Sequence, residues 1–206
     1  MYFLAHFVYT LDQHDHEQEG GRVKRFPADR LYLWHIVRLW QAERALVICK
    51  PRQMIITWLC CALALWDALF HRGVLVILQS KKLDDAVGNR LTGSGLLGRC
   101  QFILDHIPYR ELLINPAVLK PENDKVESLT FEHNSGLLPI PMGGSQIRSQ
   151  TASGWVCDEA AFQQDFEDAY TAAQSSIRGA WALLVSTADL SDGGFFRKLY
   201  KDMPDA

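Results

Sequence analysis

The segment "ALVICKPRQMIITWLCCALALW", residues 45–66, decides the fold prediction. Its apolar run, basic turn and long apolar stretch predict a strand, a tight loop and a helix, the order of a phosphate-binding (Walker A) loop, GxxxxGK[ST]. The segment has Ile55 and Ile56 where that pattern has Gly and Lys, and it keeps only the hydroxyl, at Thr57. Spacing alone leaves two interpretations open: a phosphate-binding loop, or an ordinary strand-loop-helix with a basic surface turn.

Further short apolar runs predict the rest of a central sheet. They resemble residues 45–49 in being apolar on both faces, as strands of a parallel sheet covered by helices are, and they lie at 73–80, 154–159 and 181–187. We expect helices at about 29–42, 57–70, 82–91 and 163–173, with Asp29 and Thr57 as N-terminal caps. The predicted class is α/β: a mostly parallel, three-layer αβα sheet of the P-loop NTPase (RecA/ASCE-like) type.

Residues 92–153 are less regular and rich in turn signals. Strand candidates at 128–133 and 136–141 predict an antiparallel hairpin added to the edge of the sheet. With 206 residues, 48% of them hydrophobic, the chain is long enough for one large domain. We expect a single ATPase-type domain over 1–206, with 1–28 as an N-terminal extension.

Charge and cysteine usage narrow the class of protein. The net charge of −3 shows no global basic field for nucleic acid, although a local basic patch could still serve. The five cysteines have no disulfide-like or CxxC spacing, and four of them lie within or beside apolar runs, which predicts buried thiols in a reducing compartment. The longest apolar run, 54–66, is too short to cross a bilayer. We therefore expect a soluble, cytoplasmic protein.

Two features favour the phosphate-binding interpretation of the loop. Lys50 and Arg52 lie in the loop, so the positive charge of the missing Lys could come from the start of the loop. The N-terminus of the following helix also offers free amides and a positive dipole to an anion.

The second feature is the stretch "SGWVCDEAAF", residues 153–162, in which an apolar strand ends in two acids. P-loop enzymes present a magnesium-binding acid and a general base in this way, because both must lie at the carboxyl end of a strand beside the loop. This predicts Asp158 for the metal and Glu159 for the attacking water. A helix-capping Asp is the ordinary alternative, but the upstream loop and the downstream strand-ending "LLVST" favour a joint site.

Four stretches in this order, "KPRQM", "LQSKKLDDA", "QIRSQTASGWVCDEAAF" and "LLVSTADLSDGGFFRKLY", resemble the ATPase domain of the large subunit of tailed-phage terminases, the motors that package viral DNA. The resemblance extends from residues 26–27 to Tyr200. It implies Mg²⁺ and ATP as ligands, ATP hydrolysis, and translocation of double-stranded DNA into a procapsid.

The resemblance also implies residue roles. Nucleotide contacts would come from the loop, Lys50, Pro51, Arg52, Gln53, Met54, Ile55, Ile56 and Thr57, with Lys50 or Arg52 as the catalytic cation. Thr57 and Asp158 would hold Mg²⁺, and Glu159 would be the general base. Ser186 and Thr187 match the coupling motif that senses the γ-phosphate. Arg148 is a further candidate sensor or DNA contact, and a surface Arg capping a strand explains it equally well. The chain departs from the family at Ile55, where the family has Gly.

Partners implied by the resemblance are double-stranded DNA, a portal protein, a small terminase subunit and further copies of the chain in a ring, in the host cytoplasm. No carboxylate cluster remains unassigned for two-metal cleavage, so we expect no nuclease activity from this chain. Two alternatives stay open: a helicase- or recombinase-like ATPase, and an assembly or DNA-docking module that keeps the fold and has lost nucleotide binding.

Overall fold

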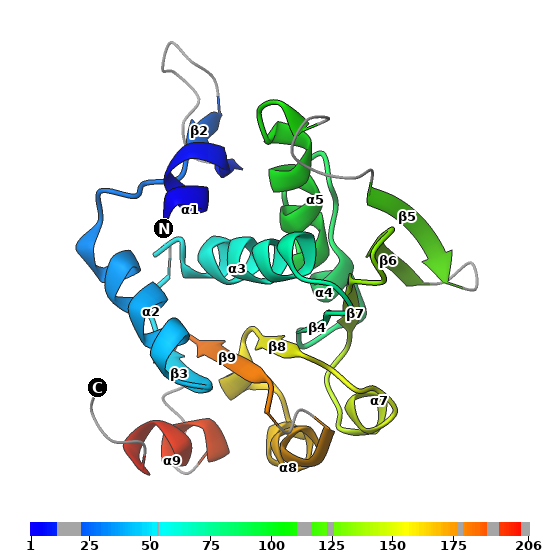
Figure 1. Ribbon diagram of the computed structural model, residues 1–206. Coiled ribbons are helices and arrows are strands. Elements are labelled where there is room, and N and C mark those ends of the chain that lie inside the picture. The colour runs from blue at the N-terminus through cyan, green and yellow to red at the C-terminus, as the bar shows by residue number, and fades with distance from the viewer. Residues whose placement is uncertain are drawn as a thin grey trace.

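A seven-stranded β-sheet forms the centre of the molecule (Figure 1). The computed structural model describes residues 1–11, 22–52, 54–110, 117–122, 126–176, 179–188 and 194–202. The strands follow the order β3-β9-β8-β4-β7-β6-β5 across the sheet. Their bounds are β3 Ala45–Cys49, β4 Leu75–Gln79, β5 Ala117–Glu122, β6 Val126–Phe131, β7 Gly136–Ile140, β8 Gly154–Cys157 and β9 Trp181–Ser186.

The sheet is parallel over most of its width. From β3 to β7 each strand pairs in parallel with its neighbour, whereas β6 pairs antiparallel with both β7 and β5. This confirms the hairpin predicted at the sheet edge and adds β5 to it. A separate two-stranded sheet pairs β1 (Tyr9–Leu11) with β2 (Val23–Arg25), both within the N-terminal extension.

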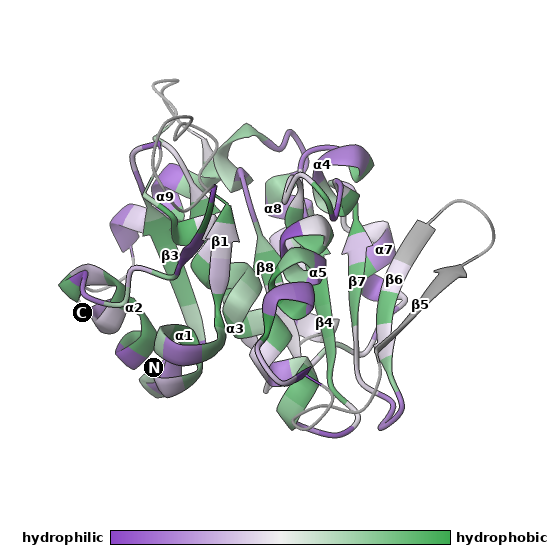
Figure 2. Cartoon of the chain, turned by 90° about the horizontal axis from the view of Figure 1, so that it is seen from above, coloured by the Kyte–Doolittle hydropathy of each residue, from purple (hydrophilic) through white to green (hydrophobic). Residues whose placement is uncertain are grey.

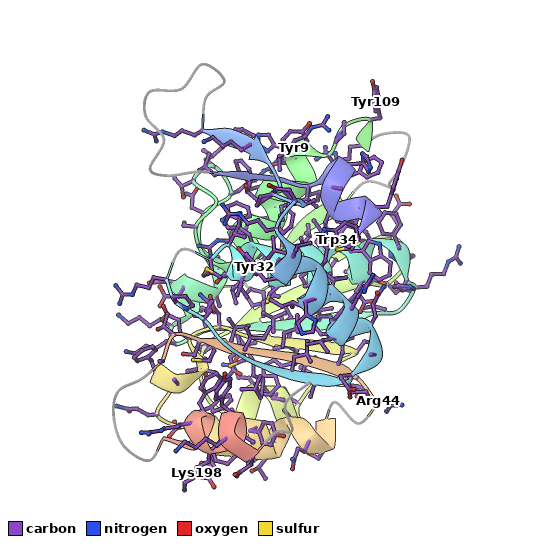
Figure 3. The ribbon with its side chains drawn as sticks, turned by 90° about the vertical axis from the view of Figure 1, so that its left-hand side faces the viewer. Tyr9, Tyr32, Trp34, Arg44, Tyr109 and Lys198 are labelled. Atoms are coloured by element: carbon purple, nitrogen blue, oxygen red, sulfur yellow. The ribbon has the colours of Figure 1, made fainter. Side chains whose placement is uncertain are left out.

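Helices cover both faces of the sheet. In Figure 1, α1, α2, α3 and α5 lie on one side and α7, α8 and α9 on the other. Tyr109, which follows α5, and Lys198, which lies in α9, are therefore at opposite ends of the molecule (Figure 3). The bounds are α1 Tyr2–Phe7, α2 Leu31–Ala42, α3 Ile56–Phe70, α4 Leu83–Val87, α5 Leu96–His106, α7 Ser145–Arg148, the 3-10 helix η1 Ala160–Phe162, α8 Phe166–Ser176 and α9 Phe195–Asp202.

Alternate residues of the central strands enter two separate cores. Val76 and Leu78 of β4 pack into the core beneath α3 and α5, while Ile77 between them packs into the core beneath α7, α8 and α9. In β8, Val156 faces the first core and Trp155 the second. This alternation follows from the two-residue period of a strand, and it places hydrophobic residues along the strands and α3 (Figure 2).

Several predicted boundaries were wrong. The residues that precede α2 and α3 are Arg30 and Ile55, so Asp29 and Thr57 do not cap these helices. Thr57 lies inside α3, where its hydroxyl has another partner. The helix expected at 82–91 ends at Val87, because Gly88 takes a positive φ of 68° that stops it.

One helix of the first core, α5, was missed altogether. The glycines of "TGSGLLG" indicated turns, yet α5 begins directly after Gly95 and contains Gly98. A Cβ at Gly98 would lie 2.7 Å from the backbone of Asn89, so a glycine is required there for close packing and not for a turn. Among the described residues, no helix is both long and apolar enough to cross a membrane.

Candidate functional site

The predicted site residues follow neighbouring parallel strands, so they meet where the carboxyl ends of these strands lie side by side. β9 lies between β3, which leads into the loop, and β8, which leads into the two acids. The backbone N–H of Lys50 donates to the carbonyl of Ser186 at 2.9 Å, which ties the start of the loop to the end of β9. The N–H of Asp158 donates to the carbonyl of Gln79 at 3.0 Å on the other side.

Thr57 and Asp158, the two residues predicted to hold magnesium, are in direct contact. The Thr57 hydroxyl Oγ1 donates to Oδ2 of Asp158 at 3.1 Å, across 101 residues of sequence. The other carboxylate oxygen, Oδ1, is buried and has no hydrogen-bond partner among the described residues. A buried carboxylate oxygen without a partner is costly, and a hard cation is the ligand that such an oxygen suits.

The donor set fits Mg²⁺ more closely than a metal held by protein alone. In the part of the chain that the structure describes, no group of three or more His, Cys, Asp or Glu side chains could hold a metal ion. Magnesium in nucleotide sites uses one or two protein oxygens and takes its other ligands from phosphates and water. Thr57 and Asp158 provide two oxygens of this kind.

Ile55 takes the backbone conformation that a glycine would take. Its φ is 55° and its ψ 5°, in the left-handed region that β-branched residues strongly avoid. The prediction left open a loop of different shape, whereas the structure shows a left-handed turn immediately before α3. Ile56, at the position of the pattern's Lys, is only 4% exposed and belongs to the core.

Tyr32 of α2 holds the loop from outside. Its hydroxyl donates to the carbonyl of Met54 at 3.0 Å, one residue before the strained Ile55, and accepts from Nη1 of Arg30 at 3.3 Å. Tyr32 is labelled beside α2 in Figure 3. This hydrogen bond ties the loop to α2 directly before its strained residue.

A cavity of about 570 Å³ opens between the loop, the two acids and the N-terminal extension. Sequence reasoning found part of its lining, the residues Lys50, Met54, Ile55, Ile56, Thr57, Asp158 and Glu159. It missed the part that distant segments supply, Thr10, Leu11, Lys24, Arg25, Pro27, Arg30, Trp58, Gly93 and Arg99. Over the whole lining of the cavity, five side chains are basic and two are acidic, so the wall suits a polyanion.

Glu159 lies at the junction of this cavity with a second one. The second cavity, of about 260 Å³, shares Arg99, Asp158 and Glu159 with the first. Glu159 is exposed and also adopts the left-handed conformation, with φ 53° and ψ 35°. The turn directs the chain away from the end of β8 directly after Asp158.

The remaining predicted site residues lie in different places. Pro51 and Arg52 are exposed and line neither cavity, and Gln53 falls outside the described residues. Arg148 ends α7, exposed, and lines neither cavity. Thr187 is half-buried after β9.

Ser186 connects the two sides of the site. Its side chain is fully buried, and its Oγ accepts a hydrogen bond from the N–H of Ala161 at 3.2 Å. Ala161 lies in η1, two residues after Glu159. The residue predicted for coupling therefore contacts the segment that carries the predicted base.

No protein-family model and no curated protein sequence matches the chain. Several solved structures, in contrast, match the chain. The large terminase of bacteriophage HK97 superposes with a TM-score of 0.71 at 14% identity, over 98% of this chain and 40% of its own. A mutant ATPase domain of the Thermus phage P74-26 large terminase gives 0.58 at 14% identity, over 82% of this chain and 68% of its own.

A third structure is the large terminase of a thermophilic bacteriophage in complex with ADP, with a TM-score of 0.52 at 13% identity, over 76% of this chain and 36% of its own. At these identities the likeness concerns the fold. The chain has the fold of the superposed part of these phage large terminases, which confirms the predicted α/β fold class. It spans less than half the length of the HK97 protein and of the ADP-bound protein.

Proposed function

We propose that this chain binds Mg²⁺ and ATP at the carboxyl ends of β3, β9 and β8, and that it hydrolyses ATP. One observation carries the proposal: Thr57 donates to one oxygen of Asp158 while the other oxygen is buried without a partner among the described residues. The only hydroxyl that the phosphate-loop pattern retains thus lies on the acid that the pattern requires.

Each residue has a chemical task in this proposal. Thr57 and Asp158 would hold the magnesium ion, which neutralises phosphate charge when it is bound. The free amides at the N-terminus of α3 would bind the phosphates, and Lys50 would add positive charge from the loop. Arg52 is the other cation proposed for the transferring phosphate. Glu159, beside Asp158 in the cavity wall, orients the attacking water and takes its proton.

The work coupled to hydrolysis is proposed to be translocation of double-stranded DNA. The support is the fold shared with phage large terminases together with the four motifs in the same order. The contact between Ser186 and Ala161 gives that coupling a physical path, because it joins the end of β9 to the segment after Glu159. A ring of copies, a portal protein and a small terminase subunit, in the host cytoplasm, belong to the same proposal.

Calorimetric titration with a non-hydrolysable ATP analogue tests the binding site. We expect binding that requires Mg²⁺ and falls at least about tenfold in Asp158→Ala, because the variant loses a charged ligand. Asp168→Ala, at an exposed position of α8 on the other face, is the matched control and keeps the parent affinity. Equal binding with and without Mg²⁺, or equal affinity in Asp158→Ala, contradicts the proposed site.

Hydrolysis is tested separately with Glu159→Gln, which keeps the shape of the side chain and removes the base. Phosphate release should slow by about 100-fold or more, while affinity for the analogue is retained. A variant that hydrolyses as fast as the parent would remove Glu159 from the mechanism.

A further inference from the structure

The proposed site has no enclosed cation at the position that the phosphate-loop pattern gives to Lys. Ile56 occupies that position and is buried in the core. Lys50 lines the cavity but is half-buried at the start of the loop, and Arg52 is exposed outside it. Charge that develops on a transferring phosphate is stabilised most strongly by a cation held in place and shielded from water.

Arg99 of α5 is half-buried like Lys50, but its guanidinium is held in place by contacts with the protein. Its Nη1 donates to the carbonyl of Gly95 at 2.7 Å, and its Cζ lies 5.5 Å from the centroid of the Trp58 ring. Its Nε is enclosed by protein and has no hydrogen-bond partner in the described structure. A guanidinium has five N–H donors, so most of its capacity remains available to a ligand.

Arg99 and Asp158 line the same two cavities without forming an ion pair. Among the described residues, no carboxylate lies within salt-bridge distance of Arg99, and Oδ1 of Asp158 is likewise without a partner. Both side chains are half-buried and face the cavities, so the guanidinium keeps donors and the carboxylate keeps an acceptor for a ligand. A phosphate group with its cation satisfies both, because the phosphate accepts from the guanidinium and the cation binds the carboxylate.

The local backbone fixes the direction of Arg99. Gly95, whose carbonyl accepts from Nη1, has a φ of 66°, and a Cβ there would lie 2.4 Å from the Cα of Gly88. Only glycine therefore fits at Gly95, and the carbonyl is held in one place. Trp58, directly after Thr57, supplies the ring over which the guanidinium lies. Arg99 is thus oriented before any ligand binds.

We propose that Arg99 supplies, from within the same chain, the cation that contacts the terminal phosphate of the bound nucleotide. The inference rests on the proposed function. The terminal phosphate is specified because Arg99 shares both cavities with Glu159, the residue proposed to act on the water that attacks it. In this way a residue downstream of the loop, in a different helix, adds a cation to those of the loop, which has Ile56 where the pattern has Lys.

Arg99→Gln is the informative variant, since Gln retains a donor for the Gly95 carbonyl and removes the charge. We expect affinity for the Mg²⁺-bound ATP analogue to fall about tenfold or more, while affinity for ADP changes little, because ADP lacks the terminal phosphate. Arg99→Lys keeps the charge without the planar fork, so part of the lost affinity should return. Arg90→Ala is the control, because Arg90 is exposed, pairs with Asp105 and lines neither cavity.

The possible outcomes distinguish a failure of the role proposed for Arg99 from a failure of the proposed ATP site. A parent protein that shows no Mg²⁺-dependent binding overturns both. A parent that binds, with Arg99→Gln reducing analogue and ADP affinity equally or not at all, overturns the assignment of Arg99 and leaves the ATP site in place. Thermal melts establish that each variant is folded, and if the Gln variant is not, Arg99→Met, which can still pack on Trp58, replaces it.

Discussion

Two residues of the site hold backbone conformations that their side chains disfavour. Ile55 and Glu159 both lie in the left-handed region, one directly before α3 and the other directly after Asp158. A left-handed conformation costs a non-glycine residue roughly 1–2 kcal/mol, and such residues concentrate at functional sites where the surrounding structure maintains them. The strain here marks the two turns that bring the loop and the acids together.

A pair of variants at position 55 measures this strain. Ile55→Gly and Ile55→Ala remove nearly the same side-chain contacts, but only glycine tolerates the left-handed turn. We expect the Gly variant to have the larger free energy of unfolding, by about 1 kcal/mol, from urea titration of both. In an ordinary helix the order is reversed, so a more stable Ala variant would show that residue 55 does not adopt the left-handed turn.

At the scale of elements, local pattern predicted the central strands and the helices α2, α3 and α8, and it missed α5 and the two N-terminal strands. The strands β3, β4, β8 and β9 were found because runs that are apolar on both faces occur only where helices cover both sides. The acids were found because they follow such a strand directly. In contrast, α5 was hidden by glycines that serve close packing, so Arg99 was missed with it.

The N-terminal wall of the cavity could not be predicted for a different reason. β1 and β2 are three residues each, too short for a periodic signal, and their place beside the loop depends on contacts between segments far apart in the sequence. Lys24, Arg25 and Arg30 therefore appear in the site only when the chain is folded. A local pattern records which residues form an element and says little about what that element packs against.

The contact between α2 and the loop can be tested through one hydroxyl. Tyr32→Phe removes the hydrogen bond to the Met54 carbonyl and leaves the ring in place. We expect a loss of about 1 kcal/mol in the free energy of unfolding, together with weaker analogue binding, because the loop is no longer restricted to one shape. Tyr170→Phe, in α8 on the opposite face, serves as the control for binding. Unchanged affinity in Tyr32→Phe would show that the loop keeps its shape without this anchor.

At the scale of the whole molecule, one sheet serves two cores. Neighbouring residues of β4, β8 and β9 belong to opposite cores, so neither core can open without loss of the strands that both use. We therefore expect the two cores to unfold together. The prediction of buried thiols also belongs at this scale. Four of the five cysteines, Cys60, Cys61, Cys100 and Cys157, are buried, and Cys49 is exposed.

The cysteines report on this cooperativity. Cys60 and Cys100 lie in the first core and Cys157 in the second. Burial raises the pKa of all three thiols well above the ordinary value, so they stay protonated and unreactive at about pH 8. We expect a thiol reagent to modify Cys49 alone in the native protein, and the buried cysteines to become reactive at a single urea concentration.

Mass spectrometry of digested samples assigns each modified residue, and Cys49→Ser should abolish the fast reaction. If Cys157 became reactive at a lower urea concentration than Cys60, the two cores would unfold separately, contrary to the prediction.

Ser186 links the loop to η1 through hydrogen bonds of one residue. Its carbonyl holds the first residue of the loop and its hydroxyl holds η1, so the two halves of the site are joined through the atoms of a single residue. Because it is fully buried, it has little freedom to absorb movement. A loss of either hydrogen bond would therefore separate the loop from η1, and with it the nucleotide side of the proposed site from the side that carries Glu159.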